Sequence, residues 1–71
     1  MPQIEWVQDV KHNWRYAAKV GDKPIGFVVV ITGGFMAHFP QDGRNKSRKF
    51  EGVGLPEIGR FLLQNWENEN A

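Results

Sequence analysis

The 71-residue sequence predicts an α+β fold, with an antiparallel meander of four to five strands, flat or curled, followed by one C-terminal amphipathic helix. Two observations predict it. Apolar and polar residues alternate over residues 14–20, which is the period of a half-buried strand. Apolar side chains then recur at helical spacing over residues 55–66. We expect a single domain over residues 1–71, because so short a chain builds only one core.

The first half of the chain contains three predicted strands. Residues 4–10 and 14–20 alternate in polarity and flank a turn at His12-Asn13. Residues 25–32 follow the turn-forming segment 21–24 and consist mostly of β-branched and aromatic side chains. Because both faces of this third strand are apolar, we expect it to lie at the centre of the sheet.

The third strand is predicted to begin a hairpin. Gly33-Gly34 is a two-residue link that tolerates the positive φ angles of a tight turn. Residues 35–39 then run back, and Pro40 ends that strand or confines it to an edge. Residues 41–49 contain no apolar side chain and are predicted to form a loop or long hairpin tip. Residues 50–53 are predicted to form a short last strand.

The helix is predicted from its start signal and its apolar stripe. Pro56 suits the first turn, where its missing N–H would be unsatisfied in any case. Glu57 lies near the positive end of the helix dipole. The stripe consists of Leu55, Ile58, Leu62 and Trp66, with Phe61 beside it.

Both faces of the predicted hairpin are apolar. With Thr32 opposite Phe35, one face carries Val28, Val30, Phe35, Ala37 and Phe39. The other face carries Ile25, Phe27, Val29, Ile31, Met36 and His38. One helix covers only one face of a sheet, so the second face is expected to be buried in a barrel, packed against a second copy, or left open to a ligand or partner.

The positive charge is concentrated in the middle of the chain. Residues 11–50 carry eight of the nine Lys and Arg residues but only two of the eight Asp and Glu residues. The densest cluster is a predicted basic loop formed by Arg44, Lys46, Arg48 and Lys49. Phosphate contacts with release of counterions are one expected role of such a cluster. A solvated loop that maintains solubility is the alternative.

These features predict a small, non-catalytic nucleic-acid-binding protein, with single strands favoured and DNA or RNA left open. Arg15 and Lys19 are expected to extend the basic cluster. Trp14 and Tyr16 alternate with them and are predicted to stack on bases or line the groove. Self-association as a homodimer remains an option for covering the second sheet face.

The alternative prediction is a protein-interaction or inhibitor module of the phage or mobile-element accessory type. In that case the second apolar face binds a protein partner, and the basic loop steers the encounter.

No catalytic residue, metal site or cofactor is predicted. The chain has no cysteine, and its two histidines, His12 and His38, are too few for a structural zinc site. No nucleophile motif accompanies them. Gly52-Val53-Gly54 lacks the spacing and lysine of a phosphate-binding loop, and is interpreted as a strand-to-helix turn.

The sequence predicts no membrane segment and a cytoplasmic location. The longest apolar run, residues 27–31, is far too short to span a bilayer. Residues 1–10 carry Glu5 and Asp9 and lack the apolar region of a signal peptide. The absence of cysteine fits a reducing compartment.

Two resemblances concern the order of the elements. Residues 48–55 resemble the last strand and helix start of a family of single-strand-binding transcriptional coactivators, which also place strands before a helix. A three-stranded sheet with one helix is similar to the DNA-binding arms of phage integrases. No site residue is carried over from either family, since a shared fold does not define function.

Overall fold

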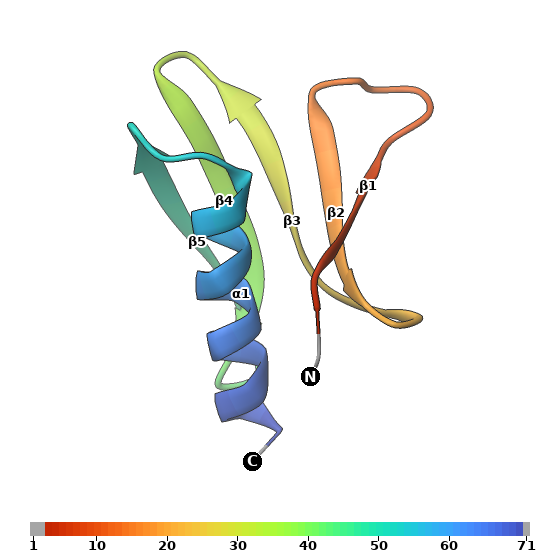
Figure 1. Ribbon diagram of the computed structural model, residues 1–71. Coiled ribbons are helices and arrows are strands. Elements are labelled where there is room, and N and C mark those ends of the chain that lie inside the picture. Colours follow the sequence, from red (N-terminus) through yellow and green to blue (C-terminus); the bar gives the residue numbers. More distant parts are fainter. Residues whose placement is uncertain (1–2, 71) are drawn as a thin grey trace.

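In the described part of the chain, five antiparallel strands form one meander, and a single helix follows them (Figure 1). The computed structural model describes residues 3–70. The strands are β1 (Glu5–Gln8), β2 (Arg15–Val20), β3 (Lys23–Ile31), β4 (Gly34–Gln41) and β5 (Arg44–Glu51), and the helix is α1 (Leu55–Glu69). The predicted α+β fold and the central place of the third strand are confirmed. The sheet does not close on itself, so the barrel alternative is wrong.

The β3–β4 turn lies one residue earlier than predicted. Ile31 pairs with Gly34, so the turn residues are Thr32 and Gly33, with Gly33 at a φ of 86°. Gly34 is the first residue of β4 and pairs with Glu51 on β5, and a Cβ there would collide with the carbonyl oxygen of Phe50, so glycine is required. The register therefore shifts by two residues, which keeps the paired side chains of β3 and β4 on their predicted faces.

The prediction of a basic loop within residues 41–49 is wrong, because the cations of this segment lie on strand β5. Residues 44–51 pair with β4 along their whole length, from Gln41↔Arg44 to Gly34↔Glu51. The loop shrinks to Asp42 and Gly43, whose φ angles of 53° and 75° fit the left-handed geometry of a tight hairpin turn. Pro40 lies one residue before the end of β4, opposite Asn45, at a point where β4 pairs with β5 but no longer with β3.

The helix begins after Gly54, with Pro56 in its first turn and Glu57 near its positive end. Its buried residues include Ile58 and Leu62, both fully inaccessible to solvent. Gly59 faces β1, where a Cβ would lie 3.4 Å from the Trp6 ring, an ordinary van der Waals contact.

The helix covers one face of the sheet and leaves the other open. On the covered face, the helix packs against Ala18, Val28, Ala37 and Phe39 in one core cluster. The alternate residues define the open face: Arg15, Ala17, Lys19, Phe27, Val29, Ile31, Met36, His38, Ser47 and Lys49.

Ile25 was predicted on the open face, and the structure corrects this. A β-bulge pairs Ala18 with Gly26 but Lys19 with Pro24, so Ile25 is the extra residue. It turns into the core, where it is 1% exposed.

Candidate functional site

The four cations of β5 form an exposed basic edge, by which we mean Arg44, Lys46, Arg48 and Lys49. β5 is an outer strand of the sheet, and all four residues are exposed. Alternation places Arg44, Lys46 and Arg48 on the helix side of the strand and Lys49 on the open face. Residues two apart on a strand rise by ~6.8 Å, so the three form an evenly spaced row.

Two of these cations have partners within the chain. The Arg48 guanidinium lies 5.0 Å from the centre of the Phe50 ring and 4.9 Å from that of Phe61 on the helix. These cation–π contacts hold it against the covered face. Lys49 Nζ lies 2.9 Å from Glu51 Oε1, but both side chains are exposed, so this ion pair is weak.

The predicted site residues on and before β2 do not join the basic edge. Strands β3 and β4 separate β2 from β5. Strand alternation also places Arg15 and Lys19 on the open face and Tyr16 on the opposite one. Trp14 precedes β2 and is 46% exposed, with its ring 4.8 Å from that of His12. The eight predicted site residues therefore fall into separate groups.

A row of side chains crosses the open face, and of its members only Arg15 was a predicted site residue. Phe27 and His38 face each other across β3 and β4, with their rings stacked at 4.7 Å. The Arg15 guanidinium lies 4.4 Å from the centre of the Phe27 ring. His38 Nδ1 lies 2.9 Å from Ser47 Oγ on β5. Only the strand register reveals this row, because its members come from four strands.

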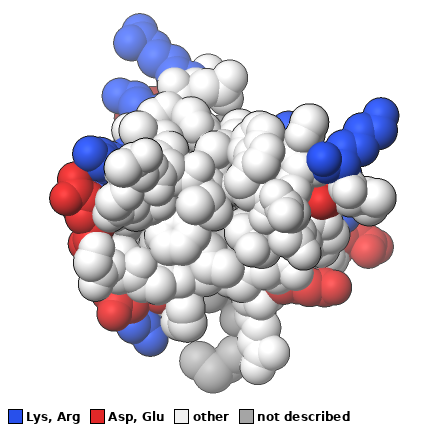
Figure 2. Space-filling view, turned by 90° about the horizontal axis from the view of Figure 1, so that it is seen from above, with Lys and Arg blue, Asp and Glu red and all other residues white. Residues whose placement is uncertain are grey.

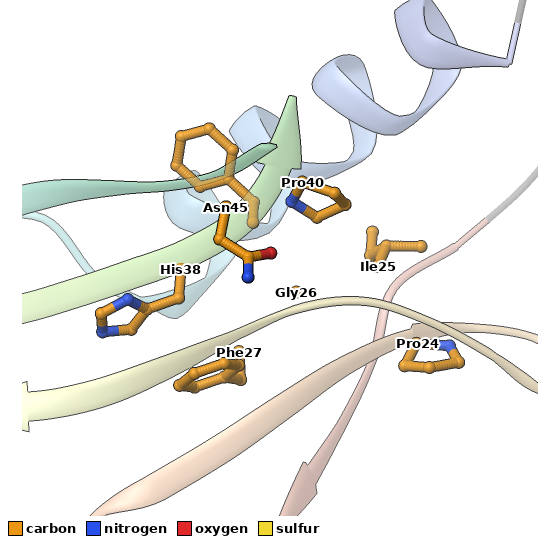
Figure 3. A pocket seen from close by; sticks show the side chains of 8 residues that line it. Pro24, Ile25, Gly26, Phe27, His38, Pro40 and Asn45 are labelled. Atoms are coloured by element: carbon orange, nitrogen blue, oxygen red, sulfur yellow. The ribbon is translucent and has the colours of Figure 1, made fainter. Parts of the chain in front are cut away.

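The sheet splits into two hairpins below this row, and a pocket of about 360 Å³ lies at the split (Figure 3). The β3–β4 pairing stops at Phe27↔His38, whereas β2–β3 continues to Lys23 and β4–β5 to Arg44. In Figure 1, the lower part of β3 bends away from β4 toward β2. The lining comes from three strands: Pro24, Ile25, Gly26, Phe27, His38, Phe39, Pro40 and Asn45.

The structure explains why the split stays open. Pro24 and Pro40 lie on its two sides, and neither has an N–H to donate across it. The helix fills the back of the gap, where Asn65 Nδ2 donates to the Pro40 carbonyl oxygen at 2.9 Å. Leu62 also lies behind Gly26, within 3.3 Å of where a Cβ would be.

Outside the basic edge, the Asp9 carboxylate is held by the turn that follows β1. Asp9 Oδ1 accepts from the backbone N–H of Lys11 at 2.8 Å and of His12 at 3.2 Å. The Lys11 hydrogen bond is the main cause of a lowered Asp9 pKa, and the contacts with His12 and Arg15 act in the same direction. Among residues 3–70, no three His, Asp or Glu side chains gather closely enough to hold a metal ion.

Charged side chains of both signs surround the end of the molecule seen from above, and the centre of that end is uncharged (Figure 2). Within the described part of the chain, the single helix has 15 residues and is not an apolar segment of membrane-spanning length.

No family model matches the chain, and no curated protein or solved structure is significantly similar to it.

Proposed function

We propose that the protein binds single-stranded nucleic acid along the basic edge. The observation that carries this proposal is the concentration of charge on β5. Four cations occupy six consecutive residues of an exposed outer strand, and residues 43–50 contain no Asp or Glu. Contacts between these cations and phosphates release counterions, which supplies affinity without sequence readout.

The shape of the edge favours a single strand over a duplex. Arg44, Lys46 and Arg48 form a straight row on one side of β5, and a flexible backbone can follow such a row. Asn45 and Ser47 lie between them on the other side and offer hydrogen bonds to sugar or base atoms. The exposed side of α1 carries Arg60 against Glu57, Glu67 and Glu69, so this helix is poorly suited to the phosphate-lined major groove of a duplex.

Cations on an outer strand also have a purely structural role, since they discourage pairing with another sheet. That role requires charge but no ligand. The nucleic-acid role therefore requires that oligonucleotides bind and that salt weakens the binding, whereas the structural role requires neither.

The test is a fluorescence-anisotropy titration of a labelled single-stranded oligonucleotide of mixed sequence, at about 50 and about 200 mM salt. The variant is Arg44→Glu/Lys46→Glu, which leaves the packed Arg48 intact. The matched control is Lys11→Glu/Lys23→Glu, which changes net charge equally at exposed positions away from β5.

We expect binding by the wild type and the control, and a loss of at least tenfold in affinity for the β5 variant. Equal affinity for both variants refutes the basic edge as the site. If both bind equally weakly compared with the wild type, the binding depends on net charge alone. No binding by any protein at the lower salt concentration refutes the proposed function.

A second candidate function, binding of a protein partner, is favoured by the open face. Val29, Ile31 and Met36 lie there with no element of the described chain above them. A second copy of the chain is the partner to test first. Sedimentation of the wild type and of Val29→Ser/Met36→Ser separates these cases, since only a dimer through this face changes its mass with the substitutions.

A further inference from the structure

The pocket at the split of the sheet has a volume and an apolar lining that suit one uncharged ring. Its volume of about 360 Å³ is within the range of small-molecule sites. Apolar groups dominate its walls, including Pro24, Ile25 and Pro40, and the backbone of Gly26 lies between the two hairpins (Figure 3). Such walls favour an uncharged ring over a charged group.

Two polar side chains reach this pocket. The Asn45 amide extends from β5 over the space above Gly26, between His38 and Pro40 (Figure 3). It makes no hydrogen bond to another side chain or to the backbone among residues 3–70, and it is exposed at the mouth of the pocket. His38 uses Nδ1 toward Ser47, which leaves Nε2 for another partner.

Asn45 also connects the pocket to the basic edge. It lies between Arg44 and Lys46 on β5, and strand alternation places its side chain opposite theirs. A nucleotide at this point can place its phosphate near the two cations and its base on the pocket side of the strand. The chemistry of the ligand is therefore that of a base attached to a phosphate backbone.

We propose that the pocket holds one base of the bound strand and that Asn45 selects adenine. This inference rests on the proposed function and assigns a base site to the same surface. An asparagine amide presents one donor and one acceptor side by side, which matches the N6 and N7 positions of adenine. Bases of a single strand are free to leave their stack and enter such a pocket.

The test compares ten-nucleotide oligo-dA and oligo-dC strands, which carry the same number of phosphates. Anisotropy titrations at about 50 mM salt use the wild type, Asn45→Leu and the control Asn68→Leu on the exposed side of α1. Asn45→Leu removes the amide at similar size and leaves the cations of β5 unchanged. Thermal unfolding of each variant verifies that the fold is retained.

We expect the wild type and Asn68→Leu to bind oligo-dA about tenfold more tightly than oligo-dC, as one bidentate contact supplies. Asn45→Leu is expected to lose that preference by weaker binding of oligo-dA, with little change for oligo-dC. Oligo-dA should also shift the NMR signals of the His38 ring protons and leave those of His12, which lies outside the pocket, in place.

The outcomes separate the two proposals. Salt-dependent binding with equal affinities for oligo-dA and oligo-dC, or a preference that Asn45→Leu leaves intact, overturns the base site and retains the basic edge. If neither oligonucleotide binds the wild type, both proposals fail.

Discussion

The two faces of the sheet receive alternate residues of the same strands, yet only one face forms a core. On β3, Val28 is completely buried beneath the helix, whereas its neighbours Phe27 and Val29 on the open face are only partly buried. Local sequence does not make this difference, because all three residues are apolar. The position of one helix decides which side chains stabilise the fold and which remain at the surface.

The two faces also differ in the chemical type of the side chains that pack on them. The covered face packs against aliphatic side chains of the helix such as Ile58 and Leu62, which have no polar atom that needs a hydrogen-bond partner. The open face contains Arg15 stacked on Phe27, and Phe27 stacked on His38. Substitutions are therefore expected to reduce stability on the first face and to affect binding or association on the second.

The largest expected effect is a cavity on the covered face. Leu62 is fully buried, so Leu62→Ala should lower the free energy of unfolding by about 2–5 kcal/mol. Met36→Ala on the partly exposed open face should cost about 1 kcal/mol or less. Urea denaturation followed by circular dichroism measures both. Equal losses would show that the open face is buried against something in solution, and the contrast between the faces would be lost.

The next effect concerns the glycine where the two hairpins separate. A Cβ on Gly26 would lie 2.8 Å from the carbonyl oxygen of His38, which belongs to the backbone and cannot easily move away. We expect Gly26→Ala to cost about 1–3 kcal/mol in urea denaturation, as overpacking does. Gly26→Ala with stability equal to the wild type would mean that β3 and β4 separate more easily than the structure indicates.

A smaller effect distinguishes two cations of the basic edge. Both side chains are exposed, but Arg48 lies over the Phe50 and Phe61 rings, whereas no such contact is seen in the described chain for Lys46 on the same side of β5. Arg48→Ala should lower the free energy of unfolding by about 1 kcal/mol through lost cation–π contact and packing. Lys46→Ala should leave it within about 0.5 kcal/mol of the wild type. The reverse order in thermal or urea unfolding would contradict the placement of Arg48.

The smallest effect lies at the β1–β2 turn, outside both faces. Backbone hydrogen bonds from Lys11 and His12 lower the pKa of Asp9 in the folded state. A lowered folded pKa stabilises the fold at pH values above the unfolded pKa of about 3.9, and this contribution is lost as the pH falls through the folded pKa. Asp9→Ala should thus melt slightly below the wild type at pH 7.

The pH series for this variant tests the assigned cause. The difference in melting temperature between wild type and Asp9→Ala should shrink from about pH 5 to about pH 3. A difference that stays constant over that range would assign the effect to the backbone of the turn rather than to the carboxylate.

The elements rich in apolar side chains were predictable from sequence, and strand β5, which has almost none, was not. Alternation around Tyr16 and the helical spacing of Ile58 and Leu62 identify β2 and α1, because both elements bury one side. Strand β5 buries little, so it has no apolar alternation, and only the Asp42-Gly43 turn signal indicates that the chain reverses there. Ile25 was misplaced because a bulge reverses alternation and leaves no mark in the sequence.

The candidate site was predictable only where its residues are close in sequence. Arg44, Lys46, Arg48 and Lys49 form a cluster that composition alone identifies. The pocket depends on where β3–β4 pairing ends, and Phe27, His38 and Asn45 come from three different strands. Such a site requires the register, and the close approach of the Phe50 carbonyl to Gly34, which leaves no room for a Cβ, has no signal in the sequence.

The central claim is that individual cations of the basic edge contact phosphates, and the salt dependence of binding tests it most directly. For single strands, log K falls with log salt concentration by about 0.7 for each phosphate contact. The experiment measures this slope for the wild type, for Lys46→Gln on β5 and for Lys11→Gln in the β1–β2 turn. The account predicts that the slope of Lys46→Gln is shallower by about 0.7 and that the slope of Lys11→Gln equals that of the wild type. Equal slopes for all three proteins would contradict it.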